Sequence, residues 1–233
     1  MKLLAIFAHP DDESYGPAGT LAKYAAEGHE VGLVTLTRGE AGSLGISKEL
    51  GPKVLAERRV QELRCAARIL KINYLQIHEL PDKRLSEQPD ETGIELIESE
   101  IQKFAPDAII TFHKDGISGH PDHKTVSKWV LQAIDQLNNS PKLFWYGVTP
   151  EQAAHVTNRK LYPMNTENIT HKIDVQNVLD TKIEAIHCHE TQVELWKTME
   201  KIPDGFEMFA RWEHFTQVRP LPTDKEIKND LFS

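Results

Sequence analysis

The stretch KLLAIFA, residues 2–8, followed at once by HPDDE, residues 9–13, decides the fold of this chain. An almost wholly apolar run of this length suits a strand of a parallel sheet, because helices cover such a sheet on both faces. The polar run then places an imidazole and carboxylates directly where the strand ends. Ligands of open α/β sheets bind beyond the carboxyl ends of the strands. Residues 9–13 are therefore the first candidate for a functional site.

The rest of the first 148 residues alternates between strand and helix patterns. This alternation predicts an α/β fold with a mostly parallel sheet and helices on both of its faces. The predicted strands are 3–8, 31–37, 73–77, 107–112 and 143–148. The predicted helices are 16–27, 54–70, 91–104 and 123–138, and a Gly-rich loop over 38–52 is expected to border the cleft.

The last third of the chain is less regular. Residues 149–169 suggest a loop with a short helix, 171–175 a strand, and 178–201 one long helix. No internal repeat, low-complexity tract or linker interrupts the pattern. We therefore predict one domain over residues 1–233.

Composition excludes several classes of function. Lys and Arg total 27 against 35 Asp and Glu, a net charge of −8, which gives no electrostatic case for binding nucleic acid or an anionic membrane. No segment has the length of a membrane span or the pattern of a secretion signal, so a cytoplasmic protein is predicted. Cys65 and Cys188 are interpreted as separate buried apolar residues rather than as a disulfide.

A second polar cluster, GHPDH at residues 119–123, follows the predicted strand 107–112. Pro121 suits the first position of a helix, which would make His120 its cap and place His123 on the same face. Three protein ligands with water in the fourth position are typical of catalytic zinc. We predict that His9, Asp12 and His123 are those ligands for one Zn²⁺ per chain.

Two further groups remain for proton transfer. A carboxylate at Asp11 could act as general base toward a water molecule. His120, if protonated, could stabilise an oxyanion and pass a proton to a leaving amine. Asp122 is expected to orient His120 and to keep it charged. This set of groups predicts metal-assisted deacylation, in which an amide is hydrolysed.

Each cluster alone also has an ordinary explanation. Two histidines near a helix start are common on polar surfaces, and carboxylates in a first turn interact favourably with the helix dipole. The two clusters together are harder to explain in this way, because both follow strands of the same predicted sheet.

At this point the chain resembles a known family, the PIG-L/LmbE-like zinc N-deacetylases. The matching motifs occur in family order and span most of the chain, with 149–170 poorly matched. They are AHPDDE (8–13), TRGEAGS (37–43), ERRVQELRCAARIL (57–70), LPDKRL (80–85), GHPDH (119–123) and HETQ (189–192). The size and the TRGEAGS loop are most similar to the bacterial branch, which includes the deacetylases of bacillithiol and mycothiol synthesis and small deacetylases of N-acetylglucosamine or chitobiose.

The resemblance implies a Rossmann-like fold and hydrolysis of the N-acetyl group of a small N-acetylglucosamine derivative, such as its malate conjugate or chitobiose. By motif it implies the zinc and proton-transfer roles given above. It also implies substrate contacts by Arg59, with Arg58 as the alternative, and by Asp82. The mycothiol branch tends to carry a tyrosine where this chain has Ser118, which argues against that branch. Family members are often homo-oligomers, and no sequence feature fixes the number of subunits.

Two other functions are consistent with the same residues. One is a deacylase of a different N-acyl amine on the same scaffold. The other is a non-catalytic metal-binding or sugar-binding protein. A pure binding module would have no need for both Asp11 and His120, which favours the enzyme.

Overall fold

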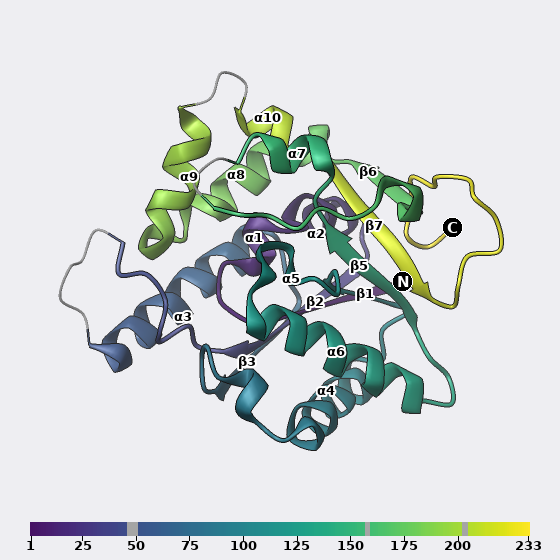
Figure 1. Cartoon of the computed structure of the whole chain (residues 1–233), viewed down its shortest axis with the longest axis horizontal. Helices are drawn as coiled ribbons and strands as arrows, with labels where there is room; N and C mark the ends of the chain where they lie inside the picture. Colours follow the sequence, from purple (N-terminus) through teal and green to yellow (C-terminus); the bar gives the residue numbers. More distant parts are fainter. Residues whose placement is uncertain (46–50, 157–158, 202–204) are drawn as a thin grey trace.

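The computed structural model describes residues 1–45, 51–156, 159–201 and 205–233; residues 46–50 of the predicted Gly-rich loop lie outside the described residues. Within the described part, seven strands form one sheet in the order β3-β2-β1-β4-β5-β7-β6 (Figure 1). The first five strands in this order, β3, β2, β1, β4 and β5, run parallel to one another. Strand β7 is antiparallel to both β5 and β6. The strands are β1 (Lys2–Phe7), β2 (Glu30–Thr37), β3 (Tyr74–Leu80), β4 (Ala108–Phe112), β5 (Lys142–Gly147), β6 (His171–Asp174) and β7 (Trp212–Arg219).

Helices cover both faces of the sheet, as the apolar strands require. Helices α2, α3 and α8 pack together on one face, and α4 and α6 pack together on the other (Figure 1). These helices are α2 (Ala18–Ala26), α3 (Pro52–Ile69), α4 (Asp90–Phe104), α6 (Pro121–Gln136) and α8 (Leu179–His187). The shorter helices are α1 (Asp12–Tyr15), α5 (Gly116–Gly119), α7 (Pro150–Ala154), α9 (Val193–Glu200) and α10 (Gly205–Ala210), with 3₁₀ turns η1 (Leu85–Glu87), η2 (Thr166–Asn168), η3 (Gln176–Val178) and η4 (Glu190–Gln192). The predicted α/β class is confirmed.

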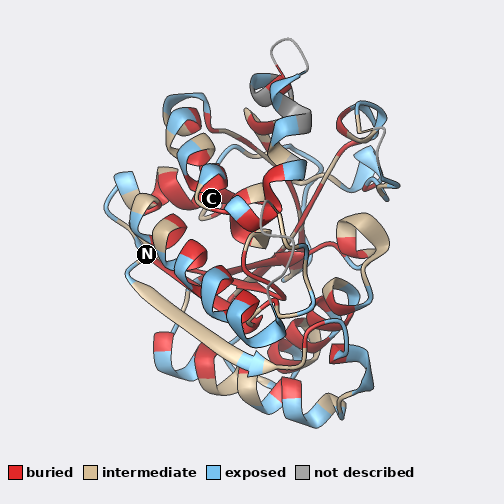
Figure 2. Cartoon of the chain, turned by 90° about the vertical axis from the view of Figure 1, so that its left-hand side faces the viewer, coloured by how far each residue is buried: buried red, intermediate tan, exposed pale blue. Residues whose placement is uncertain are grey.

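The central strands are the most deeply buried part of the chain (Figure 2). Leu3 to Ile6 of β1 and Ala108 to Ile110 of β4 are fully buried, because β1 and β4 are interior strands with helices above and below. This explains why their sequences are continuously apolar rather than alternating.

Strands β1 and β4 are neighbours and run parallel, with Leu3 opposite Ala108 and Ala5 opposite Ile110. The chain leaves β1 toward α2 on one face, whereas it leaves β4 toward α6 on the other. The two loops therefore diverge, and they open a crevice at the point where ligands bind in doubly wound folds. The two polar clusters of the sequence, residues 9–13 and 119–123, lie on these two connections and include the first residues of α1 and α6.

The C-terminal third corrects two predictions. The single helix predicted over 178–201 is wrong: the chain forms α8, η4 and α9, and it leaves helical geometry at His189, whose φ and ψ are −89° and 66°. His189 turns inward here and its ring is fully buried. Strand β7 was not predicted, and Phe215 of this strand lies in the core. Among the described residues, no helix is both long and apolar enough to cross a membrane.

The two cysteines form a disulfide, so the prediction of separate thiols was wrong. Cys65 lies on α3, and Cys188 follows α8, 123 residues later. The bond therefore ties the segment after α8 to α3. Periodicity placed both residues in helices, but it could not show that the two helices pack against each other.

This disulfide should stabilise the oxidised protein. We expect Cys188→Ala to lower the free energy of unfolding by about 2–4 kcal/mol, because a long loop in the unfolded chain is no longer closed. Urea denaturation with and without reductant measures this change. The reduced wild-type protein should match the variant, and the variant should not respond to reductant. Equal midpoints for oxidised and reduced wild-type protein would contradict the expectation.

Candidate metal centre and active site

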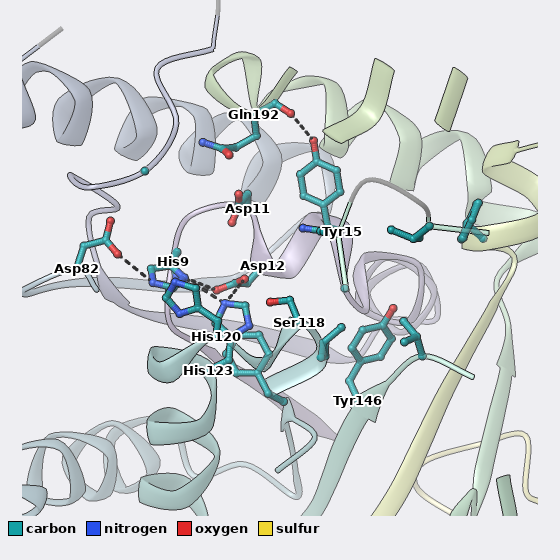
Figure 3. A pocket seen from close by; sticks show the side chains of 18 of the residues that line it. His9, Asp11, Asp12, Tyr15, Asp82, Ser118, His120, His123, Tyr146 and Gln192 are labelled. Carbon is teal, nitrogen blue, oxygen red and sulfur yellow. Dashed lines mark hydrogen bonds and ion pairs between the residues drawn. The ribbon is translucent and has the colours of Figure 1, made fainter. Parts of the chain in front are cut away.

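A pocket of about 300 Å³ opens beyond the carboxyl ends of β1 and β4 (Figure 3). Its walls come from the loop after β1, the segment between β4 and α6, and the region around α7, η4 and α10. All predicted site residues except the buried Asp122 line this pocket: His9, Asp11, Asp12, Arg59, Asp82, His120 and His123. The structure thus brings together residues that lie more than a hundred positions apart.

Three of these side chains converge as metal ligands would. His9 Nδ1 lies 3.3 Å from Asp12 Oδ2 and 3.2 Å from His123 Nε2, and His123 Nε2 lies 3.1 Å from Asp12 Oδ1. Ligand atoms that hold a tetrahedral ion at about 2.0–2.1 Å lie about 3.3 Å from one another. Asp12 makes these contacts with both of its oxygens, Oδ2 toward His9 and Oδ1 toward His123, so two imidazole nitrogens and one carboxylate lie at about this spacing.

The second nitrogen of His9 is held by two buried carboxylates. Its Nε2 lies 3.0 Å from Asp82 Oδ1 and 3.1 Å from Asp122 Oδ2. A proton on Nε2 is shared between these acceptors, which leaves the Nδ1 lone pair for a metal. Although burial opposes it, the pKa of His9 is raised well above the ordinary value by Asp12, Asp122 and Asp82.

This arrangement corrects the role predicted for Asp122. Its carboxylate contacts His9 rather than His120, and it also accepts the backbone N–H groups of Lys83 and Leu85 at 2.7 and 3.1 Å. Asp82 likewise accepts the N–H of Ala41 at 2.8 Å. Burial alone would raise the pKa of Asp82, but the hydrogen bond from His9 and the charge of that ring hold it at about 2.

Two sets of three ligand-type atoms lie within 4.8 Å of one another among the described residues: His9 with Asp82 and Asp122, and His9 with His120 and His123. In the first set the carboxylates already accept backbone N–H groups, as well as the His9 proton. Asp82 and Asp122 are thus placed as carboxylates that orient the His9 ring, a common arrangement around metal-binding histidines.

His123 is oriented from behind in the same way. Its Nδ1 lies 3.1 Å from the carbonyl oxygen of Gly116, to which it can donate, so Nε2 is left free to face Asp12. Its ring stacks on Phe112 with centroids 4.0 Å apart and planes at 5°. The stacking on Phe112 and the contact with the Gly116 carbonyl oxygen together fix the direction in which Nε2 points.

Asp11 adopts an uncommon backbone conformation at the start of α1. Its φ is 113° and its ψ −27°, in a region that costs a residue other than glycine about 1–3 kcal/mol. Asp11 Oδ2 lies 3.2 Å from Arg59 Nη2, and the backbone N–H donates to Glu13 Oε2 at 3.0 Å. Burial, opposed in part by the charge of Arg59, raises the pKa of Asp11 to about 6. A carboxylate with such a pKa is well suited to a general base near neutral pH.

His120 caps α6, and Pro121 is the first residue of that helix, as the sequence predicts. His120 Nδ1 accepts the backbone N–H of Asp122 at 3.2 Å, so a neutral ring carries its proton on Nε2. Burial, together with the neighbouring rings of His123 and His9, lowers the pKa of His120 to about 4. Asp122 favours the charged ring, as the sequence suggested, but burial and the neighbouring rings outweigh its effect on this pKa.

Of the two arginines proposed for substrate contact, Arg59 and Arg58, one lies in the pocket and the other lies outside it. Arg59 is buried, lines the pocket, and donates to the carbonyl oxygens of Pro10 and Gly39. Gly39 has a φ of +69°, and a Cβ there would collide with the Arg59 guanidinium, so this close approach requires glycine. Arg58 is half-exposed and pairs with Glu190 instead. Of the two, Arg59 is the one that faces the pocket.

Sequence reasoning missed several residues at the site. Tyr15, Tyr146 and Gln192 line the pocket near Asp11 and Asp12 (Figure 3). Behind them, the fully buried pair Glu13 and His189 is joined by a contact of 2.7 Å. Glu13 belongs to the first motif and His189 to HETQ, but no spacing rule connects positions that are 176 residues apart.

Known proteins are similar to this chain over most of its length. The family described as "PIG-L: GlcNAc-PI de-N-acetylase" matches residues 4–134, more than half of the chain. A relative from Bacillus subtilis, a probable N-acetyl-alpha-D-glucosaminyl L-malate deacetylase 2, is 30% identical over 90% of this chain and 92% of its own length. A relative from Saccharopolyspora erythraea, 1D-myo-inositol 2-acetamido-2-deoxy-alpha-D-glucopyranoside deacetylase 1, is 28% identical over 84% of this chain and 78% of its own length.

Solved structures show the same fold at lower identity. An N,N'-diacetylchitobiose deacetylase from Pyrococcus horikoshii superposes with a TM-score of 0.72 and 21% identity, covering 95% of this chain and 87% of the other. A 4-carboxy-2-hydroxymuconate hydratase from Pseudomonas putida superposes with a TM-score of 0.72 and 18% identity, covering 96% and 98%. At such identities these likenesses establish the fold alone.

The contacts of Asp122 predict a measurable effect on metal affinity. If the pocket holds a divalent metal ion on His9, we expect Asp122→Asn to weaken its binding by about 10–100-fold, because the change removes a charged acceptor that orients His9. Competition with a chromophoric chelator measures the affinity. Asp115→Asn, at a half-exposed position before α5, should bind the same metal ion as the wild-type protein does. Unchanged affinity in Asp122→Asn would show that Asp122 does not support the ligand.

Proposed function

Because the chain belongs to the PIG-L family of GlcNAc-PI de-N-acetylases, we propose that it is a metal-dependent hydrolase that removes the N-acetyl group from an N-acetylglucosamine conjugate. One observation carries the proposal: the side chains of His9, Asp12 and His123 converge in a pocket that Asp11 and His120 also line. Relatives named for two different conjugates are both deacetylases, which supports the reaction class.

We propose zinc, one ion per chain, as the metal held by His9, Asp12 and His123. Two imidazoles and one carboxylate, with a fourth position open, form a donor set that catalytic zinc uses. Bound there, the ion would polarise the acetamide oxygen and lower the pKa of a water molecule.

Asp11 is placed to act as the general base. Arg59 holds one carboxylate oxygen, and the side chain faces the pocket beside Asp12 (Figure 3). With a pKa of about 6, Asp11 is ionised near neutral pH and can take a proton from water as the water attacks the acetamide carbon. The resulting carboxylic acid can then return this proton to the leaving amine.

His120 acts as a hydrogen-bond donor in this scheme. Because Nδ1 is occupied by the Asp122 N–H, the Nε2 proton is available to the acetamide oxygen as negative charge develops on it. A neutral imidazole cannot give up that proton easily. We therefore assign delivery of the amine proton to Asp11 rather than to His120, the residue that the sequence suggested.

Charge around the pocket favours an acidic conjugate. Asp11 is paired with Arg59, and Asp82 with His9. By contrast, the exposed side chains of Lys83 and Arg159 line the pocket, and within the described part of the chain neither has an ion-pair partner. Of the two conjugates named for the relatives, the malate conjugate carries carboxylates and the inositol conjugate carries none. We propose that the malate type is closer to the natural substrate.

The Ser118 side chain lines the pocket where the mycothiol branch tends to place a tyrosine (Figure 3). Sugar contacts by Arg59 and Asp82, one domain over 1–233, a cytoplasmic location and association into homo-oligomers stay predictions.

The role of Asp11 can be tested by Asp11→Asn. Asparagine tolerates a positive φ and keeps the side-chain shape, so the variant should fold and bind about one zinc per chain. Turnover should fall by about 10²–10⁴-fold because the proton acceptor is lost. Acetate release is measured together with zinc content, on metal-stripped and zinc-restored protein.

Asp180→Asn, an exposed position at the start of α8, serves as the control and should retain full turnover. Wild-type turnover in Asp11→Asn would contradict the assignment of the base. Metal-independent acetate release by the wild-type protein would contradict the metal-dependent mechanism.

The preference for an acidic conjugate has a separate test. Arg159→Gln and Lys83→Gln should each raise KM for the malate conjugate about tenfold, the effect of losing one partly screened charged contact. KM for N-acetylglucosamine and for the inositol conjugate should stay within about twofold, since these substrates present no anion. Lys160→Gln, which changes an exposed side chain outside the pocket lining, is the matched control. Equal effects on charged and neutral substrates would refute the proposal.

A further inference from the structure

We propose that Glu13 and His189, called here the Glu13–His189 pair, position the backbone of Asp11 for its task as general base. The inference rests on the role proposed above for Asp11. Neither residue contacts the predicted metal ligands through its carboxylate or ring in the described structure, so both would act through Asp11.

The conformation of Asp11 needs support from its surroundings. A side chain at φ 113° is disfavoured, and such conformations persist only where neighbouring contacts over-determine them. The backbone N–H of Asp11 donates to Glu13 Oε2 at 3.0 Å, and its carbonyl oxygen accepts the N–H groups of Ser14 and Tyr15, both at 3.0 Å. The Glu13 carboxylate thus accepts the hydrogen bond that holds the backbone N–H of Asp11.

Glu13 is held in turn by His189. The carboxylate is fully buried, and its Oε1 lies 2.7 Å from His189 Nε2 and 2.6 Å from Ser14 Oγ. A buried carboxylate is costly unless hydrogen bonds or an opposite charge compensate it. Because the His189 ring is fully buried as well, the pair is shielded from water and has one defined geometry.

His189 owes its position to α3. Cys188 is bonded to Cys65, and Glu62 accepts the Thr191 N–H at 3.0 Å and the Thr191 hydroxyl at 2.6 Å. These contacts fix the chain on both sides of His189 to one helix. The same helix carries Arg59, which contacts the Asp11 carboxylate.

Helix α3 therefore reaches Asp11 by two routes. Arg59 orients the side chain directly, and the Glu13–His189 pair holds the backbone. Misplacement of a catalytic group by about 1 Å can cost about 10²-fold in rate, so loss of the second route should appear in kcat.

Three variants measured as zinc-loaded, full-length protein test the inference. His189→Ala should lower kcat for acetate release by about 10–100-fold, with KM within about twofold and about one zinc per chain retained. His189→Gln, whose amide N–H can still donate to Glu13, should recover most of this loss. His171→Ala removes another fully buried ring, in β6, and should lower stability while leaving kcat unchanged.

A second readout does not depend on catalysis. Hydrogen exchange at the Asp11 amide, followed by NMR in the zinc-loaded protein, should speed up at least about tenfold in His189→Ala and stay as in wild type in His171→Ala. Unchanged exchange at Asp11 in a folded His189→Ala protein would overturn the inference. So would an equal loss of kcat in His189→Ala and His171→Ala.

The two proposals fail in different ways. If the wild-type protein releases no acetate from any conjugate, the proposed function is wrong, and the amide exchange still decides whether the pair holds Asp11. If the wild-type protein is active and His189→Ala has wild-type kcat, the proposed function stands and the positioning role is wrong.

Discussion

The parallel hydrogen bonding of β1 to β4 is the constraint on which the site depends. It aligns the carboxyl ends of two strands that are separated by about a hundred residues. Because α2 and α6, the main helices after these strands, lie on opposite faces of the sheet, a crevice opens between the two connections. His9 follows β1 and Asp12 begins α1, whereas His123 lies in the first turn of α6, which follows β4 and α5. A ligand set of this kind can be complete only when both strands are in register.

Buried charge is arranged in pairs around this crevice. His9 takes part in two groups of contacts. Its Nδ1 faces Asp12 and His123. Its Nε2 contacts the carboxylates of Asp82 and Asp122. Each of these carboxylates is compensated by an imidazole or by backbone N–H groups, as burial demands. The exposed side chains of Lys83 and Arg159 also line the pocket.

The fold alone does not determine the reaction. A hydratase and a deacetylase superpose on this chain equally well, so the chemistry depends on side chains placed on a shared scaffold. This chain places at its pocket two imidazoles and one carboxylate in mutual contact, the uncommon backbone of Asp11, and a His120 ring oriented by its own helix start.

The sequence by itself determined the α/β class, the strand ends that carry the site, the capping of α6 by His120, and two polar clusters, residues 9–13 and 119–123, that meet at the pocket. These features depend on local patterns: apolar runs, short spacings and the fixed geometry of proline. Only the tertiary structure decided that Asp122 supports His9, that the helix predicted over 178–201 breaks at His189, and that Cys65 meets Cys188. The Asp122–His9 contact and the disulfide each join residues more than a hundred positions apart, and His189, where the helix breaks, contacts Glu13 at a similar separation. Such segments come together through tertiary packing, which no local sequence pattern predicts.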